Sequence, residues 1–251
     1  MTGNLRIRTG GGGEPVLLLL HGLGATGDVW DGWSDLLDER WPGRWVAPDL
    51  PGHGGSDPLT RYSFGAVAAS VAELVQPTER VAVLGHSMGG VVGLALGSGW
   101  FGVQVDAVIG LGIKVSWTAD ELARVRALAE RPVAWFDSYA DAASRYLRVS
   151  GLLGLFPPDG PATEAGLRNE GGRWRLAQDP ATFAIGAPDM AGLLAASRAD
   201  VTLARGERDE MVTDDQLSAL VQSASTVPGL GHNAHVEEPA AVWRLLESVL
   251  R

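Results

Sequence analysis

The stretch Gly85-His-Ser-Met-Gly-Gly90 decides the fold, because it follows a short apolar run and opens a helical pattern. A serine on a sharp turn from strand to helix is forced into a strained backbone conformation, which requires glycine two residues before and two residues after it. The turn lifts the Ser87 hydroxyl above the sheet, where the helix N-terminus faces any negative charge that develops in a reaction. The plain alternative is a glycine-rich turn with an incidental serine, and residues elsewhere in the chain discriminate between the two.

A serine hydroxyl becomes a nucleophile only when a base removes its proton, so the turn requires a histidine and an orienting carboxylate. Asp209 follows a buried-strand pattern and His232 precedes the last helical pattern, which is the order serine, acid, histidine expected after such a turn. Glu207 and Glu210 are rival acids that stand outside the favoured position. The predicted catalytic residues are therefore Ser87, Asp209 and His232.

A second glycine turn provides a candidate for stabilising negative charge. The run Val16 to Leu20 is continuously apolar, as expected for a strand buried on both faces, and it leads into His21-Gly-Leu-Gly24. This turn can present the Leu23 N–H to the cavity above the serine, and Met88 supplies another N–H at the start of the following helix. Leu23 and Met88 are therefore the predicted oxyanion-hole amides, and His21 is expected to have a structural hydrogen-bonding role.

Short apolar runs that contain valine alternate with helical patterns along most of the chain. The predicted strands lie around 5–8, 16–20, 45–48, 80–84, 105–109, 200–204 and 226–227. The predicted helices span roughly 34–39, 63–75, 88–96, 214–222 and 239–250. This alternation predicts an α/β fold with a mostly parallel, doubly wound sheet.

The interval 113–197 departs from this alternation and contains no convincing buried strand. A helix is predicted to begin at the capping box Thr118-Ala-Asp-Glu121, and further helical patterns cover 132–148 and 179–196. We therefore expect a core domain formed by 1–112 and 198–251, with 113–197 inserted as a helical cap. Aromatic residues in helices more often belong to a core, but those of the cap are candidates for pocket walls. The predicted pocket residues are Trp135 and Phe136 of the cap and Trp30 of the core.

Composition restricts the class of protein and its partners. The 251 residues suffice for one α/β domain, and 45% hydrophobic with 20% charged residues is typical of a globular chain. The 30 acidic and 20 basic residues give a net charge of −10 without a Lys/Arg-rich stretch, which disfavours nucleic acid and anionic membranes as partners. The absence of cysteine excludes disulfides, cysteine nucleophiles and thiolate metal sites. Neither a signal-peptide pattern nor a membrane-spanning run is present, so a cytoplasmic location is expected.

Together these motifs resemble the α/β-hydrolase superfamily, specifically its cap-bearing, esterase-like serine members. The resemblance extends over nearly the whole chain and rests on His21–Gly24, Asp49–Ser56, the turn at Ser87, Asp209 and Gly231–Glu237. It implies that Ser87 is the nucleophile, that His232 acts as base and then as acid, and that Asp209 orients the imidazole. The two amides named above would form the oxyanion hole. A serine at this turn argues against the haloalkane dehalogenase and epoxide hydrolase branches, whose nucleophile is a carboxylate.

The resemblance implies hydrolysis of small to medium carboxylic esters through an acyl-enzyme intermediate. Carbon–carbon bond hydrolysis of dienoate-type diketones, and lactonase or perhydrolase activity, use the same triad and stay open as alternatives. A small-ligand receptor on the same scaffold is the non-enzymatic alternative, and an intact triad weighs against it. The expected partner is a small ester-like molecule, and no cofactor is expected.

Two other motifs suggest different chemistry. Gly22-Leu-Gly-Ala-Thr-Gly27 matches the dinucleotide-binding fingerprint, with Asp49 at the end of the next strand. A dinucleotide site would leave the serine turn and its two partners unexplained. His232 and His235 have the spacing of two metal ligands, but no third ligand has a matching spacing, so no metal is expected.

Overall fold

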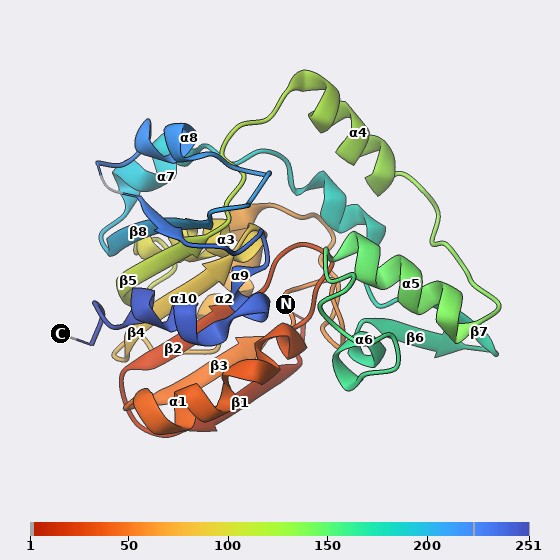
Figure 1. Ribbon diagram of the computed structural model, residues 1–251, viewed down its shortest axis with the longest axis horizontal. Coiled ribbons are helices and arrows are strands. Elements are labelled where there is room, and N and C mark those ends of the chain that lie inside the picture. Colours follow the sequence, from red (N-terminus) through yellow and green to blue (C-terminus); the bar gives the residue numbers. More distant parts are fainter. Residues whose placement is uncertain (1–2, 223, 251) are drawn as a thin grey trace.

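A seven-stranded sheet forms the centre of the computed structural model, which describes residues 3–222 and 224–250 (Figure 1). The strand order is β1-β3-β2-β4-β5-β8-β9, in which β1 is antiparallel to β3 and the other neighbours are parallel. The strands are β1 (Ile7–Gly11), β2 (Val16–Leu20), β3 (Arg44–Pro48), β4 (Arg80–His86), β5 (Gln104–Leu111), β8 (Asp200–Gly206) and β9 (Ser225–Val227). The predicted α/β fold with a mostly parallel sheet is confirmed.

Helices cover both faces of this sheet, as Figure 1 shows. On one face lie α2 (Phe64–Ala72), α3 (Met88–Gly97), α7 (Met190–Ala196) and α8 (Asp214–Ser218). On the other lie the 3₁₀ helix η1 (Gly27–Trp33), α1 (Ser34–Arg40), α9 (Ala234–Glu237) and α10 (Pro239–Leu246). The sheet is therefore doubly wound.

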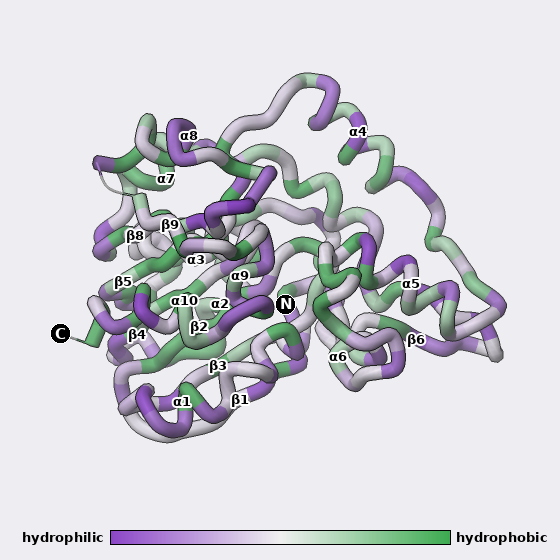
Figure 2. Tube along the Cα trace, in the orientation of Figure 1, coloured by the Kyte–Doolittle hydropathy of each residue, from purple (hydrophilic) through white to green (hydrophobic). Residues whose placement is uncertain are grey.

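Strand β2 shows why the sheet needs helices on both sides. All five of its residues are fully buried, and side chains alternate between the two faces of a strand. Leu18 packs in one hydrophobic cluster with Val67 of α2 and Leu94 of α3. Leu19 packs in the second cluster with Trp243 of α10. The apolar interior of the sheet is also visible in the hydropathy colouring of Figure 2.

Most predicted elements of the core coincide with observed ones. Six of the seven sheet strands begin and end within two residues of their predicted bounds, and β1 is displaced to Ile7–Gly11. This displacement arises because Gly10 and Gly11, read as part of a flexible run, pair with Trp45 and Arg44 of β3. The helices α2, α8 and α10 are shorter than predicted.

The inserted segment was expected to be helical, and this expectation was wrong in one part. It contains a β-hairpin formed by β6 (Leu167–Glu170) and β7 (Arg173–Leu176). The turn residues Gly171 and Gly172 have φ of 61° and 85°, which a glycine pair adopts without strain. A Gly-Gly pair between two short runs was the signal for this hairpin, but its mostly exposed strands lack a buried-strand pattern.

The helices of the inserted segment are also shorter than their patterns suggested. They are α4 (Ala119–Ala129), α5 (Tyr139–Val149), α6 (Pro161–Ala165) and the 3₁₀ helix η2 (Pro180–Ile185). The capping box at the start of α4 is confirmed, whereas α5 begins only after its cap Ser138. The predicted helix over 179–196 is interrupted at Gly186, where φ is 86°. The part beyond this break is α7, which packs through Met190 against the core rather than serving as cap.

Helix α4 is weakly attached to the rest of the molecule. None of its residues is buried, and its contacts are mainly with η2. Figure 1 shows α4 between two long connections, away from the sheet. Among the described helices, none combines the length and hydropathy needed to cross a bilayer.

Candidate active site

Ser87 lies on the sharp turn between β4 and α3. With φ of 50° and ψ of −115°, it is the one non-glycine residue with positive φ in the described part of the chain. Such a conformation costs about 1–3 kcal/mol. A Cβ on Gly85 would lie 2.4 Å from the carbonyl oxygen of Gly89, and a Cβ on Gly89 would lie 2.3 Å from that of Leu20. The glycines of the motif are therefore required by the close packing of β2, β4 and α3.

Asp209 and His232 are in direct contact in the loops that follow β8 and β9. The Nδ1 atom of His232 lies 3.0 Å from Oδ2 of Asp209. The other carboxylate oxygen of Asp209 accepts the N–H of Met211 at 2.8 Å. Because a carboxylate can only accept here, Nδ1 carries the ring proton and Nε2 is left free to take another. His232 lines the same cavity as Ser87, so the fold brings the three predicted catalytic residues to one site.

The two rival acids have other surroundings. A carboxylate oxygen of Glu207 accepts the N–H of Gly229 at 2.7 Å, so this side chain ties two loops together. Glu210 is exposed to solvent. Within the described residues, Asp209 is the one acid that contacts His232.

Arg205 holds the loop that carries Asp209, and the motifs did not indicate it. It lies near the end of β8 and is only 7% exposed. Its guanidinium donates to the carbonyl oxygens of Val212 at 2.8 Å, Glu207 at 2.9 Å and Asp209 at 3.0 Å. The guanidinium also forms an ion pair with Asp214 at 3.1 Å. An arginine at the buried end of a strand was the only sequence signal for this role, because its bonds to the Asp209 loop go to backbone atoms.

Four of the five histidines are buried and neutral at pH 7. Burial lowers the pKa of His21 to about 4 and the pKa values of His53 and His235 to about 3. Burial and the neighbouring His235 and His232 hold the pKa of His86 well below its ordinary range. His232 alone combines a partly exposed side chain with a carboxylate partner. This environment suits a general base that exchanges a proton with a bound molecule.

His86 and His235 form a packed layer behind His232. His86 donates from Nε2 to the carbonyl oxygen of His232 at 3.0 Å, and its ring centroid lies 4.2 Å from that of His235. The ring of Trp30 lies 4.6 Å from His235 on the other side. Trp30 is not among the residues that line the cavity, so its prediction as a pocket wall was wrong. In the described residues, no group of three or more histidine, cysteine or acidic side chains could hold a metal ion.

Buried histidines also shape the turn that presents Leu23. His21 donates from Nδ1 to the carbonyl oxygen of the glycine before Leu23 at 2.7 Å. His53 accepts, at Nε2, the N–H of the glycine after it at 3.1 Å. The N–H groups of Leu23 and Met88 have no acceptor among the described residues, and both residues line the cavity of Ser87. Two unpaired donors are thus available beside the serine.

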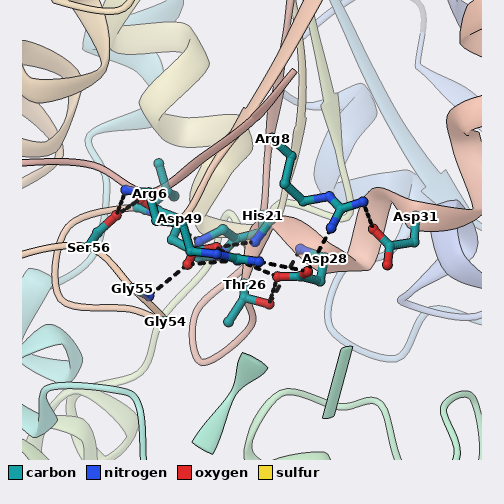
Figure 3. A network of polar contacts seen from close by, with 12 residues as sticks. Arg6, Arg8, His21, Thr26, Asp28, Asp31, Asp49, Gly54, Gly55 and Ser56 are labelled. Atoms are coloured by element: carbon teal, nitrogen blue, oxygen red, sulfur yellow. Dashed lines mark hydrogen bonds and ion pairs between the residues drawn. The ribbon is translucent and has the colours of Figure 1, made fainter. Parts of the chain in front are cut away.

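A buried charge network of Arg6, Asp28 and Asp49 lies next to the loop that continues from this turn (Figure 3). Asp49 accepts the N–H of Gly27 at 2.7 Å and the N–H of Gly55 at 2.8 Å, which joins two loops. The guanidinium of Arg6 bridges the carboxylates of Asp49 and Asp28, at 3.1 Å and 3.0 Å. Both carboxylates are nearly inaccessible, so their charges need compensation. Arg6 supplies it for both, and Arg8 forms a further ion pair with Asp28 at 3.0 Å.

The cavity at Ser87 has a volume of about 300 Å³, at the lower end for a small-molecule site. Its walls are mainly apolar and come from the core and from the inserted segment. The apolar walls include Leu23, Phe64, Val91, Ile113, Trp117, Val125, Val149, Phe183, Ile185, Pro188 and Met211.

The two cap aromatics predicted to line this pocket lie elsewhere. Trp135 is 36% exposed, and Arg173 and Arg175 pack over its ring at 5.8 Å and 5.9 Å. Phe136 donates its N–H to the carbonyl oxygen of Trp174 in the hairpin at 2.8 Å. The prediction was wrong because 132–138 is not helical, and Phe136 forms an isolated bridge with Trp174 of the hairpin that the sequence analysis missed. Trp117 and Phe183 are the cap aromatics that line the cavity.

Comparison with known proteins identifies the class of this fold and site. Residues 17–245 match the family model described as "Alpha/beta hydrolase family". The chain therefore belongs to the α/β hydrolase family. The glycine run that matches a dinucleotide fingerprint is, in this fold, the turn that lies beside the serine.

Individual relatives and solved structures agree with this family. The pimeloyl-[acyl-carrier protein] methyl ester esterase of Methylococcus capsulatus is 31% identical over 185 residues, which cover 65% of this chain and 69% of that protein. The 2-succinyl-6-hydroxy-2,4-cyclohexadiene-1-carboxylate synthase of Enterobacter sp. is 27% identical over 258 residues, covering 99% and 96%. The structure of E-2-(acetamidomethylene)succinate hydrolase has a TM-score of 0.81 at 21% identity, over 99% of this chain and 95% of that one. Four other curated relatives match more strongly but locally, and the chain spans only 25–32% of their length.

Removal of Arg6 tests the buried charge network. Burial alone would raise the pKa of Asp28, but the hydrogen bond and charge of Arg6 outweigh it and lower that pKa. The pair therefore stabilises the fold above the unfolded pKa of about 3.9, and this stability is lost as pH falls through the lower folded value. Arg6→Gln should lower the free energy of unfolding by about 2 kcal/mol at pH 7, between the values for exposed and buried pairs. Urea denaturation at pH 7 and at about pH 3 should show the difference shrinking in acid.

The control for this experiment is Arg80→Gln, which breaks the ion pair with Asp106. Arg80 has a side chain that is 66% exposed, so we expect a loss below about 1 kcal/mol. Equal losses for both variants would contradict a special role for the network.

Removal of Arg205 tests the support of the Asp209 loop. Arg205→Gln leaves three carbonyl oxygens without their donor and should lower the free energy of unfolding by about 3 kcal/mol. The downfield proton resonance of the hydrogen bond between His232 and Asp209 should broaden or disappear. Arg208→Gln is the matched control, because the Arg208 side chain is 70% exposed, and its effect should stay within about 0.5 kcal/mol. A sharp, unshifted resonance in Arg205→Gln would show that the carboxylate is held without the arginine.

Proposed function

We propose that this chain is a serine hydrolase that cleaves small to medium carboxylic esters through an acyl-enzyme intermediate on Ser87. The observation that carries the proposal is the strained serine turn in one cavity with a histidine whose Nδ1 lies 3.0 Å from a buried carboxylate. Backbone strain persists where the surrounding structure over-determines it, typically at functional sites. A receptor that only bound a ligand would need neither the strained turn nor the oriented imidazole.

Acylation follows from the arrangement of these groups. His232 takes the proton of the Ser87 hydroxyl at Nε2 while Oγ attacks the ester carbonyl carbon, and the carboxylate of Asp209 stabilises the imidazolium. The carbonyl oxygen becomes an oxyanion that the N–H groups of Leu23 and Met88 can receive. The tetrahedral intermediate then expels the alcohol, which receives its proton from His232, and the acyl group stays on Ser87.

Deacylation repeats these steps with water. His232 removes a proton from a water molecule, whose oxygen attacks the acyl carbon, and the same two amides receive the oxyanion. The carbon–oxygen bond to Ser87 breaks, and His232 returns the proton to Oγ. The products are a carboxylic acid and the free enzyme, and the protein supplies every group in this cycle.

The relatives support an ester substrate and a second candidate. One relative is an esterase that acts on a methyl ester of an acyl-carrier-protein conjugate, by its name. Another, similar over nearly the whole chain, is named as a synthase. Carbon–carbon bond chemistry therefore stays the second candidate, and a panel of esters, a lactone and a dienoate diketone would discriminate between them. A small-molecule partner and a cytoplasmic location are part of the same proposal.

Substitution of the serine tests the nucleophile. Ser87→Ala should lower kcat for a short p-nitrophenyl ester by about 10⁴-fold or more, because no acyl-enzyme can form. A fluorophosphonate should modify the wild-type protein once, at Ser87, as measured by mass spectrometry. Ser98→Ala, in a buried position at the end of α3, is the matched control and should keep its activity. Labelling of a folded Ser87→Ala protein would overturn the assignment.

Truncation of a cavity wall tests where the acyl chain binds. Phe183→Ala should change the ratio of kcat/KM between long and short p-nitrophenyl esters by about 10-fold or more, the usual effect of one pocket contact. Trp135→Ala removes an aromatic residue of the same segment that lies outside the cavity, so the ratio should stay constant. An equal change in both variants would mean that the acyl chain does not bind in this cavity.

A further inference from the structure

The charged residues of the catalytic cavity are of one sign. Lys114 and Arg148 line it, and no aspartate or glutamate is among its lining residues in the described part of the chain. This contrasts with the whole protein, whose net charge is −10. A cavity with apolar walls focuses the field of the charges that line it. The site is therefore a positive hollow in an acidic protein.

Lys114 is already compensated within the protein. Its Nζ lies 2.8 Å from a carboxylate oxygen of Glu121 and 5.2 Å from the ring centroid of Trp117. Glu121 is also the N3 residue of the capping box of α4, so this ion pair belongs to the attachment of that helix. Lys114 therefore offers little charge to a bound molecule.

Arg148 is exposed at the cavity, and it differs because its guanidinium has no ion pair or hydrogen bond to any described residue. It stands in the last turn of α5, where the helix C-terminus offers only partial negative charge. A guanidinium presents a planar set of N–H donors that matches the geometry of a carboxylate or a phosphate. Arg148 is thus the one cation of the cavity walls that is free to receive an anion.

We propose that the substrate carries an oxyanion group, a carboxylate or a phosphate, that binds Arg148 while its ester lies at Ser87. The apolar walls between the two residues would hold a hydrocarbon chain, so the substrate class is the half-ester of an α,ω-diacid. This inference rests on the proposed ester hydrolysis and specifies its substrate. The free acid released by the reaction would then carry two anionic groups.

Paired substrates test the inference through kinetics. Monomethyl adipate and methyl hexanoate differ by one terminal carboxylate, and half-esters of succinate and suberate test the distance to Arg148. The wild-type kcat/KM should favour the best half-ester over its neutral partner by about 10-fold or more, as expected for a charge-assisted hydrogen bond. Arg148→Gln should bring this ratio close to one, and Arg148→Lys should retain part of it.

The matched control is Arg145→Gln. Arg145 is on the same helix and exposed like Arg148, but it lines an adjoining hollow rather than the catalytic cavity. The ratio should stay at its wild-type value in this variant. A wild-type ratio of one would overturn the proposal, because the preference for the half-ester would be absent. An equal fall in both variants would also overturn it, because the preference would then come from the overall electrostatic field of the protein.

Equilibrium binding separates this inference from the proposed function. Calorimetric titration of Ser87→Ala with monomethyl adipate measures recognition without turnover, and the double variant Ser87→Ala/Arg148→Gln should bind it about 10-fold more weakly. If no ester is hydrolysed but this difference is found, the proposed function fails and the anion site stands. If esters are hydrolysed and the difference is absent, the anion site fails. The methyl ester of ω-phosphonohexanoate distinguishes the sources, since tighter binding than monomethyl adipate would assign a phosphate.

Discussion

The close approach of backbone around Gly85 and Gly89 is the constraint on which this active site depends. The two glycines allow α3 to start directly against β2 and β4, and this contact keeps Ser87 in a conformation that an isolated peptide would leave. The register between the two strands, with Leu20 opposite Gly85, also aligns their ends. The turn that follows β2 therefore lies next to the serine, so one strand pairing positions both the proposed nucleophile and a proposed oxyanion donor.

Neutral hydrogen-bonding groups hold the loops around this point. His21 and His53 act as donor and acceptor to the turn of Leu23, and burial keeps them uncharged. A charged group in their place would be costly to bury and would disturb the field at the serine. The buried carboxylates of Asp28 and Asp49 are compensated by Arg6, which lies between them. This arrangement leaves His232 as the one histidine placed to change its charge during a reaction.

The sequence predicted the parts of the structure that follow from local geometry. The serine turn, the buried strand before it and the order of Asp209 and His232 could be inferred because glycine spacing and apolar runs have direct steric causes. The pocket walls could not, because they depend on how 113–197 folds back on the core. Trp135 and Phe136 contact a hairpin whose only signal is Gly171-Gly172, and Trp30 packs behind His235. Arg205 was also missed, since its bonds to the Asp209 loop go to backbone carbonyl groups, which no residue type in the sequence indicates.

Because α4 is loosely attached, we expect this helix to open independently of the sheet. A helix without a buried residue contributes little apolar burial, so it opens at a much lower free energy than the strands beneath it. Amide hydrogens of 119–129 would then exchange with solvent while those of β2 and β4 stay protected. Substitutions in this helix would likewise change the free energy of unfolding only slightly, although Val125 forms part of the cavity wall. Substitutions in α4 can therefore change which molecules fit the cavity without changing the residues around Ser87.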